Sequence, residues 1–247
     1  MKNNKLCLLW QNKKSRNWYH VGNLTYEKDK YFFVYQVEQS KRNVFEALEN
    51  GYRLHPTFPN VHEKYESTIL FSAFARRLPQ KSRKDYRVIL KNLGITKEST
   101  DFEIMSITGG TINSDNYEFV KPIEREGTKF KLDFYLRGWR HYNNETEYLE
   151  ASDELSLKLD PENKFDDDAV AIYKNEEKKI GYVPAFYSAF ITEMVKAEEG
   201  STDVSYTMNY KYDPEAPSHF KVEMEIQGLG YENILKSDIG SSVVQAV

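Results

Sequence analysis

The chain has 247 residues, of which 29% are charged and 40% hydrophobic, and its formal net charge is −4; this is the balance of a soluble globular protein. No stretch approaches the ~18 apolar residues of a membrane-spanning helix, and the apolar segment 6–10 is too short for the core of a signal peptide. The single cysteine, Cys7, excludes an internal disulfide framework, so we predict a protein of the reducing cytoplasm.

The charge is distributed unevenly along the chain. Residues 1–122 carry 20 Lys and Arg against 13 Asp and Glu, a formal charge of +7, whereas residues 123–247 carry 14 against 25, a formal charge of −11. The length allows a hydrophobic core in each half. We therefore predict two domains of opposite charge.

The spacing of apolar residues predicts short elements throughout the first half. The predicted strands cover 5–10, 18–26, 31–35, 102–107 and 117–120, and the predicted helices cover 44–48, 61–78 and 82–93. The second half is richer in strands. There the predicted strands cover 130–136, 155–159, 169–173, 180–183, 204–212 and 220–226, with one helix from Pro184 to Gly200. Both halves are therefore expected to be α+β.

A polar loop between the strands 155–159 and 169–173 carries a candidate binding site. It begins with the turn sequence Asp160 to Asn163 and continues with Phe165 and Asp166. A polar loop rarely offers an aromatic side chain to water without a functional reason. We therefore treat this loop as the first candidate for ligand contact.

The segment around this loop resembles the HIRAN domain in three separated pieces that follow in the same order. The pieces are Gly138 to Tyr142; the loop residues Asp160, Pro161, Asn163, Phe165, Asp166, Ala169 and Val170; and Ile180, Gly181, Tyr182, Val183 and Pro184. The resemblance spans roughly 128–228. It implies an OB-like small β-barrel with one main helix, and binding of single-stranded DNA with capture of a 3′ end.

By motif position, the resemblance also implies site residues. Arg140, His141 and Tyr142 would meet the DNA backbone or a terminal nucleotide, and Phe165 would stack on a base. Asn163 and Asp166 would make polar contacts, Asp166 with the terminal 3′ hydroxyl. Two positions depart from the family pattern: His141 stands where an aromatic residue is usual, and Lys164 where proline is common. The alternatives are that Phe165 folds onto the barrel and that Asn163 and Asp166 brace the loop.

The first half resembles the N-terminal subdomain of HipA-type toxin kinases, and the separate small protein that corresponds to it in three-component systems. The carrying motifs are Val21 to Leu24, Phe32 to Tyr35, Leu78 and Pro79, Arg83, Asp85 and Leu90 to Gly94, Ile107 to Thr111, and Phe119. The kinase core of that family has no counterpart in the remaining length. The resemblance therefore implies an interaction or regulatory module.

A cluster of basic residues, called here the basic cluster, offers a second candidate interface in the first half. Its members are Arg76, Arg77, Lys81, Arg83, Lys84, Arg87 and Lys91. It would extend a DNA path, dock an acidic partner, or dock the acidic half of the same chain. The alternative is an ordinary solvated helix face.

Neither a metal centre nor a catalytic site is predicted. Asp166, Asp167 and Asp168 are consecutive, so their carboxylates point in different directions, and the calcium-loop spacing is absent. The five histidines lack zinc-ligand spacing, and there is no phosphate-binding glycine loop or nucleophile elbow. We therefore predict a chain that is not an enzyme and has no cofactor.

These observations combine into one prediction and one alternative. We predict a HipA-like α+β module over 1–122, a linker over 123–127, a HIRAN-like barrel over 128–228 and a tail over 229–247 whose lack of periodicity is compatible with partial disorder. The predicted function is non-enzymatic binding of single-stranded DNA or 3′ ends in a bacterial toxin–antitoxin or genome-defence system. The alternative is an antitoxin-like regulator that binds a HipA-type kinase toxin or a DNA-binding antitoxin, with the barrel as scaffold or sensor.

Overall fold

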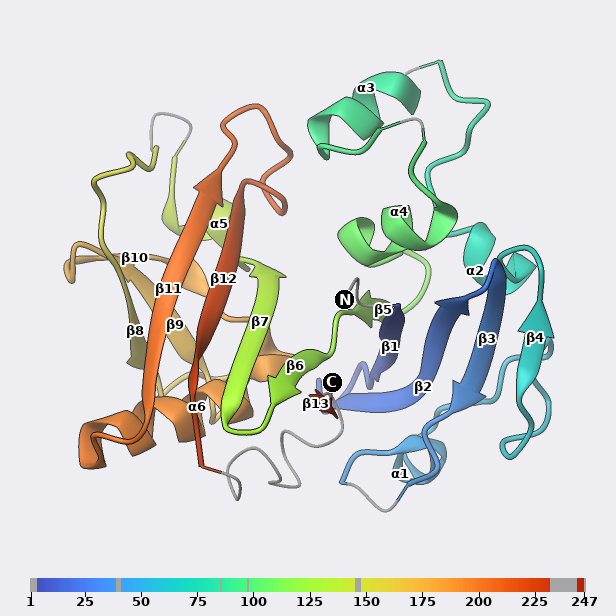
Figure 1. The fold of residues 1–247 in the computed structure, drawn as a ribbon, viewed down its shortest axis with the longest axis horizontal. Coiled ribbons are helices and arrows are strands. Elements are labelled where there is room, and N and C mark those ends of the chain that lie inside the picture. Colours follow the sequence, from blue (N-terminus) through green and yellow to red (C-terminus); the bar gives the residue numbers. More distant parts are fainter. Residues whose placement is uncertain are drawn as a thin grey trace. The chain divides into compact units, whose positions relative to one another are not determined.

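A computed structural model describes residues 4–38, 41–84, 86–96, 98–144, 148–231 and 244–246. The chain divides into two compact units, Met1–Pro122 and Ile123–Val247, which are shown in Figure 1 and described separately below. The division falls at the point where the formal charge changes sign. Among the described residues, no helix combines the length and the apolar character needed to cross a bilayer.

The first unit is built on one antiparallel sheet. Its strands are β1 (Lys5–Gln11), β2 (Trp18–Glu27), β3 (Lys30–Tyr35), β4 (Tyr65–Ser67) and β5 (Tyr117–Val120), and its helices are α1 (Val44–Glu49), α2 (Ser72–Ala75), α3 (Tyr86–Asn92) and α4 (Asp101–Thr108). The strand order is β4-β3-β2-β1-β5, so the sheet grows outward from the hairpins of the first 35 residues.

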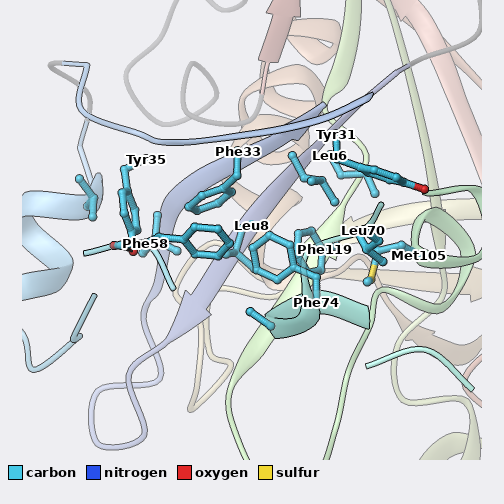
Figure 2. Close-up of a cluster of buried hydrophobic side chains, with 14 of the residues drawn as sticks. Leu6, Leu8, Tyr31, Phe33, Tyr35, Phe58, Leu70, Phe74, Met105 and Phe119 are labelled. Atoms are coloured by element: carbon cyan, nitrogen blue, oxygen red, sulfur yellow. Dashed lines mark hydrogen bonds between the residues drawn. The ribbon is translucent and has the colours of Figure 1, made fainter. Parts of the chain in front are cut away.

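Aromatic packing holds this unit together. The ring centroid of Phe33 on β3 lies 4.5 Å from that of Phe58 and 5.3 Å from that of Phe74 on α2. Phe74 in turn meets Phe119 on β5 edge-on at 5.0 Å. Figure 2 shows these rings gathered in one cluster with Leu8. Because burial of large apolar side chains is the main favourable term in folding, this cluster fixes α2 and β5 against the sheet.

Two predicted elements of the first unit are wrong. The segment 61–78 forms β4, a loop and α2 instead of one helix, because pairing of β4 with β3 overrides the helical spacing and Ile69 is left 74% exposed. The segment 102–107 forms helix α4 instead of a strand. A capping box starts this helix: the Thr100 side chain accepts a bond from the Glu103 N–H, and the Glu103 carboxylate accepts one from the Thr100 N–H.

Arg77 belongs to the interior and not to the surface of the basic cluster. Its side chain is only 4% exposed, and its guanidinium donates to the Gly110 carbonyl at 3.2 Å and to both carboxylate oxygens of Asp115, at 3.1 and 2.5 Å. A buried guanidinium needs such partners because the loss of hydration is otherwise uncompensated. Arg77 therefore anchors the segment between α4 and β5 to the end of α2.

We expect Arg77→Met to lower the free energy of unfolding of the first unit by about 3 kcal/mol, because it leaves Asp115 without its buried partner. Urea unfolding of the purified protein measures this change. The matched control is Arg76→Met, whose parent side chain is exposed; its effect should stay within about 0.5 kcal/mol. Equal effects of the two substitutions would contradict the anchoring role.

The second unit contains two sheets. Its strands are β6 (Ile123–Glu126), β7 (Lys129–Tyr135), β8 (Leu155–Leu159), β9 (Val170–Lys174), β10 (Lys178–Tyr182), β11 (Ser205–Tyr212), β12 (Val222–Leu229) and β13 (Val244–Ala246), and its helices are α5 (Trp139–Tyr142) and α6 (Ala185–Gly200). One sheet has the order β10-β9-β8 and the other β11-β12-β7-β6-β13. The strands and the helix predicted for this half are confirmed, with small shifts at their ends.

The alternating pattern of the strands positions their core. Leu132 on β7 and Ile226 on β12 are paired across the ladder and are buried. The residues next to each of them along the strand point to the other face and are more exposed. Phe190 on α6 packs edge-on against Phe130 of β7 at 5.2 Å. Helix α6 therefore covers the apolar face of the larger sheet.

The predicted OB-like β-barrel is not closed among the residues that the structure describes. The two sheets are separate and are joined by an isolated bridge between Arg137 and Tyr182. The chain leaves β7 through Gly138, which adopts a left-handed φ of 83°, and enters α5, so the ladder does not continue into β10.

The boundaries of the second unit also differ from the prediction. Most of the proposed linker 123–127 is strand β6, which turns through Gly127 at φ 58° and pairs with β7. Of the tail 229–247, residues 232–243 and 247 lie outside the described part of the chain. Strand β13, near the end of this tail, pairs parallel with β6 and therefore belongs to the sheet.

Candidate nucleic-acid interface

The short helix α5 presents the first group of predicted site residues. Trp139 is buried and lies with its ring centroid 5.6 Å from that of Tyr212, which fixes the helix to the larger sheet. Arg140 and His141 follow and are exposed, with Arg140 Nε 3.5 Å from His141 Nε2. Tyr142 is 39% exposed. One helical turn therefore places Arg140, His141 and Tyr142 together at the surface.

The surroundings of α5 are locally basic although the unit as a whole is acidic. Burial lowers the pKa of His219, and repulsion from the nearby Arg137 and Arg140 lowers it further. His219 is therefore neutral at neutral pH, and the local positive charge comes from the two arginines. Two arginines therefore lie close together beside α5 in a unit whose formal charge is −11.

The loop between β8 and β9 presents the second group. The Asn163 side chain accepts a bond from the Phe165 N–H at 3.0 Å, and Asp166 Oδ1 accepts one from the Asp168 N–H at 3.1 Å. Both side chains therefore brace the loop, as one of the alternatives predicted. Phe165 is 69% exposed, so its ring is accessible to a ligand.

The acidic triplet Asp166 to Asp168 has a structural role in this loop. The Asp168 carbonyl accepts a bond from Thr192 Oγ1 of α6 at 3.0 Å, which ties the loop to the helix. Among the residues that the structure describes, no group of three or more His, Cys, Asp and Glu side chains is arranged to hold a metal ion. The Asp166 carboxylate and the Asp168 carbonyl therefore help to hold the loop in position.

A polar network that the sequence analysis missed joins the loop to α5. The Tyr182 hydroxyl donates to Asp160 Oδ2 at 2.5 Å, and Lys179 Nζ lies 3.0 Å from the same oxygen and 2.9 Å from the Tyr182 hydroxyl. The ring of Tyr142 packs edge-on against that of Tyr182, with centroids 5.7 Å apart. Asp160 and Tyr182 belong to the sequence motif, whereas Lys179 does not. Lys179 contacts them because the pairing of β10 is irregular between Lys179 and Gly181.

The network has a defined charge state. The bond from Tyr182 and then that from Lys179 lower the pKa of the Asp160 carboxyl. Burial opposes the charge of Lys179, but its bonds to Tyr182 and Asp160 outweigh burial and raise its pKa. Burial, followed by the bond to Asp160, raises the pKa of Tyr182 to about 12. A carboxylate, an ammonium and a neutral phenol therefore coexist across the neutral range.

We expect Asp160→Asn to make the stability of the second unit depend less on pH in the acidic range. The pKa of Asp160 is lowered in the folded state, so its contribution is present above the ordinary value of 3.8 and is lost as the pH falls through the folded pKa. The variant should be less stable than the wild type at neutral pH and should lose less on acidification. Thermal unfolding between about pH 3 and pH 6 measures this. The control is the exposed Asp167→Asn, and parallel profiles of Asp160→Asn and the wild type would contradict the network.

The remaining members of the basic cluster lie at the surface of the first unit. Arg76, Lys81, Arg83, Lys84, Arg87 and Lys91 are exposed. Lys81 pairs with Asp101 of α4 at 3.2 Å. Arg87 and Lys91 border an open groove of about 340 Å³, whose apolar lining comes from Leu90 and Ile95. The structure thus brings six of the seven predicted residues to the surface.

Comparisons with known proteins give one solved structure and one family model that match this chain. The crystal structure of the HIRAN domain of human HLTF matches with 13% sequence identity and a TM-score of 0.35, covering 46% of this chain and 85% of that chain. No curated protein matches the sequence. A family model matches residues 129–227, and it is that of the HIRAN domain. The match leaves out residues 1–122, so the HipA-like character of that half stays a prediction. Residues 129–227 are therefore a HIRAN domain.

Proposed function

We propose that this chain is a non-enzymatic, cytoplasmic DNA-binding protein whose HIRAN domain binds single-stranded DNA and captures its 3′ end. The observation that carries the proposal is the exposed ring of Phe165 on the braced loop of a HIRAN domain. Proteins that bind single strands combine aromatic platforms, on which bases stack, with a few cations that meet the backbone. This domain offers both kinds of group.

Each candidate residue has a role in this proposal. Phe165 stacks on a base, and Arg140 and His141 on α5 meet phosphates. Asp166, held by its bond to the Asp168 N–H, accepts a bond from the terminal 3′ hydroxyl. The network of Asp160, Lys179 and Tyr182 supports Tyr142 and fixes α5 beside the start of the loop. Preorganisation of this kind reduces the entropy lost on binding.

The test is a titration of the full chain with labelled single-stranded and duplex DNA of the same sequence, between about 50 and 200 mM salt. We expect tighter binding to the single strand and an affinity for it that falls with salt, because phosphate contacts release counterions. Equal binding to the two forms, or no binding at the lowest salt, would refute the proposal. Loss of binding in Arg140→Gln, with no loss in Lys211→Gln on the larger sheet, would assign the phosphate contacts to α5.

A second candidate function is a protein-interaction regulator of the antitoxin type, which the formal charge of −11 in the second half favours. In it, the first unit binds a HipA-type kinase toxin or a DNA-binding antitoxin within a toxin–antitoxin or defence system. This context is supported only by motifs of the first half, such as Val21 to Leu24. Co-purification with a HipA-type kinase that lacks its own N-terminal subdomain would favour this function. Failure of the two proteins to co-purify would count against it.

A further inference from the structure

The three-stranded sheet has one face that carries lysine and tyrosine side chains. The register pairs Lys158 with Ala171, Ser156 with Tyr173, Lys179 with Tyr173, and Tyr182 with Ala171. Since side chains alternate between the faces of a strand, these residues share one face, while Leu157 and Ile172 point to the core. We call the line of Lys158, Tyr173 and Lys179 the lysine–tyrosine row.

Both lysines of the lysine–tyrosine row lie near the ring of Tyr173. Lys158 Nζ lies 4.6 Å from the ring centroid of Tyr173, and Lys179 Nζ lies 6.0 Å from it. The two ammonium groups therefore flank one aromatic ring. Cations interleaved with aromatic side chains on an open sheet are the arrangement that single-strand binders use, with the cations on phosphates and the rings on bases.

The row is continuous with the interface proposed above. Lys179 bonds to Asp160 at the start of the loop and lies 5.7 Å from the ring centroid of Tyr142 on α5. A DNA strand whose 3′ end lies at Phe165 and α5 would therefore pass Lys179 before it reaches Tyr173. The sheet face beyond the loop is the direct continuation of the site.

We propose that the lysine–tyrosine row is a second contact site for single-stranded DNA, which holds nucleotides on the 5′ side of a captured 3′ end. This inference rests on the proposed function. Lys158 neutralises a phosphate, and Tyr173 stacks on a base once Lys158 moves from its ring to that phosphate, while Lys179 keeps its bonds to Asp160 and Tyr182 and adds positive charge beside the DNA. The carboxylate that now pairs with Lys158, at 2.8 Å, belongs to Glu176, whose side chain is 68% exposed. A phosphate replaces it at little cost because surface ion pairs are weak.

The chemistry of the row favours nucleic acid over a protein partner. Ala171, which shares this face with the row, is 1% exposed and offers no apolar surface for a protein side chain. An acidic peptide would pair with the lysines but would have no planar group for Tyr173. A single strand supplies a negative charge and a planar base with each nucleotide.

The first test compares oligonucleotides of about 4 and about 12 nucleotides, both with a 3′ hydroxyl, because sites of this kind span about 4–16 nucleotides. In Tyr173→Ala we expect the affinity for the longer strand to fall about 5- to 150-fold, the effect of one lost stacked base, and that for the shorter strand to be unchanged. Tyr173→Phe keeps the ring and should bind both strands as the wild type does. Hydrogen exchange of the second unit verifies that the variants are folded.

A second variant tests the row without removing the ring. Lys158→Gln should reduce the slope of log affinity against log salt for the longer strand by about 0.7, the loss of one phosphate contact, whereas Lys211→Gln should leave it unchanged. If the wild type binds both strands and the variants of the row bind them equally well, the inference fails and the proposed function stands. If the wild type binds no single strand, both fail. An acidic peptide that competes at the row while DNA does not would also overturn the inference.

Discussion

Phe165→Ala is expected to weaken binding of single-stranded DNA about 5- to 150-fold and to leave the stability of the second unit unchanged. The binding loss follows from the removal of a stacking platform, which contributes about 1–3 kcal/mol per base. The stability expectation follows from the 69% exposure of the ring, since an exposed side chain contributes little to the core. Fluorescence anisotropy and thermal unfolding of the same preparation measure the two quantities.

The matched control for Phe165→Ala is Phe45→Ala. Phe45 is an exposed phenylalanine of the first unit, 39% accessible, and takes no part in the proposed interface. Its removal should leave the affinity for DNA as it is. An unchanged affinity in Phe165→Ala would mean that the exposed ring is not a DNA contact, and an equal loss in both variants would point to a general loss of hydrophobic surface.

Gly181→Val is expected to destabilise the second unit by at least about 3 kcal/mol. A Cβ placed on Gly181 would lie 2.2 Å from Leu136 Cδ2 and 2.4 Å from the Arg137 carbonyl oxygen, so backbone as well as side chain has to move. The same displacement breaks the bridge between Arg137 and Tyr182, through which the two sheets are joined. Hydrogen exchange resolved by peptide measures the loss in each unit separately, and protection of the first unit should be retained.

Gly200→Ala is the control for Gly181→Val. Nothing lies within 4 Å of a Cβ at Gly200, which ends α6, so alanine should be neutral or should stabilise the helix by up to about 1 kcal/mol. Wild-type protection in Gly181→Val would show that the close approach to Arg137 is not required. It would also show that the bridge between Arg137 and Tyr182 tolerates a side chain at position 181.

Most of the second unit could be predicted from the sequence because its strands alternate cleanly. Leu155 to Leu159 and Val204 to Tyr212 each carry the period of two that a half-buried strand imposes, and these elements are confirmed. The first unit was harder. Phe102 to Ile107 is rich in residues that favour strands, but the capping box of Thr100 and Glu103 starts a helix there.

The candidate site could be predicted only where a motif names its residues. Asn163 and Asp166 follow from the loop motif, and their bracing bonds follow from the chemistry of their side chains. Lys179 could not be predicted, because an irregular step in β10 brings it to Asp160 and such steps leave no signal in the sequence. Arg77 could not be told from its exposed neighbour Arg76, because its partner Asp115 is 38 residues away.

The most direct test of the central claim is the affinity of the full chain for two single-stranded oligonucleotides that differ only at the 3′ end, one with a hydroxyl and one with a phosphate. Capture of a 3′ end predicts tighter binding to the hydroxyl form and loss of this preference in Asp166→Ala, because Asp166 would accept a bond from the hydroxyl and would repel a phosphate. Equal affinity for the two oligonucleotides, or a preference that persists in Asp166→Ala, would contradict the claim that this HIRAN domain holds the 3′ end at its loop.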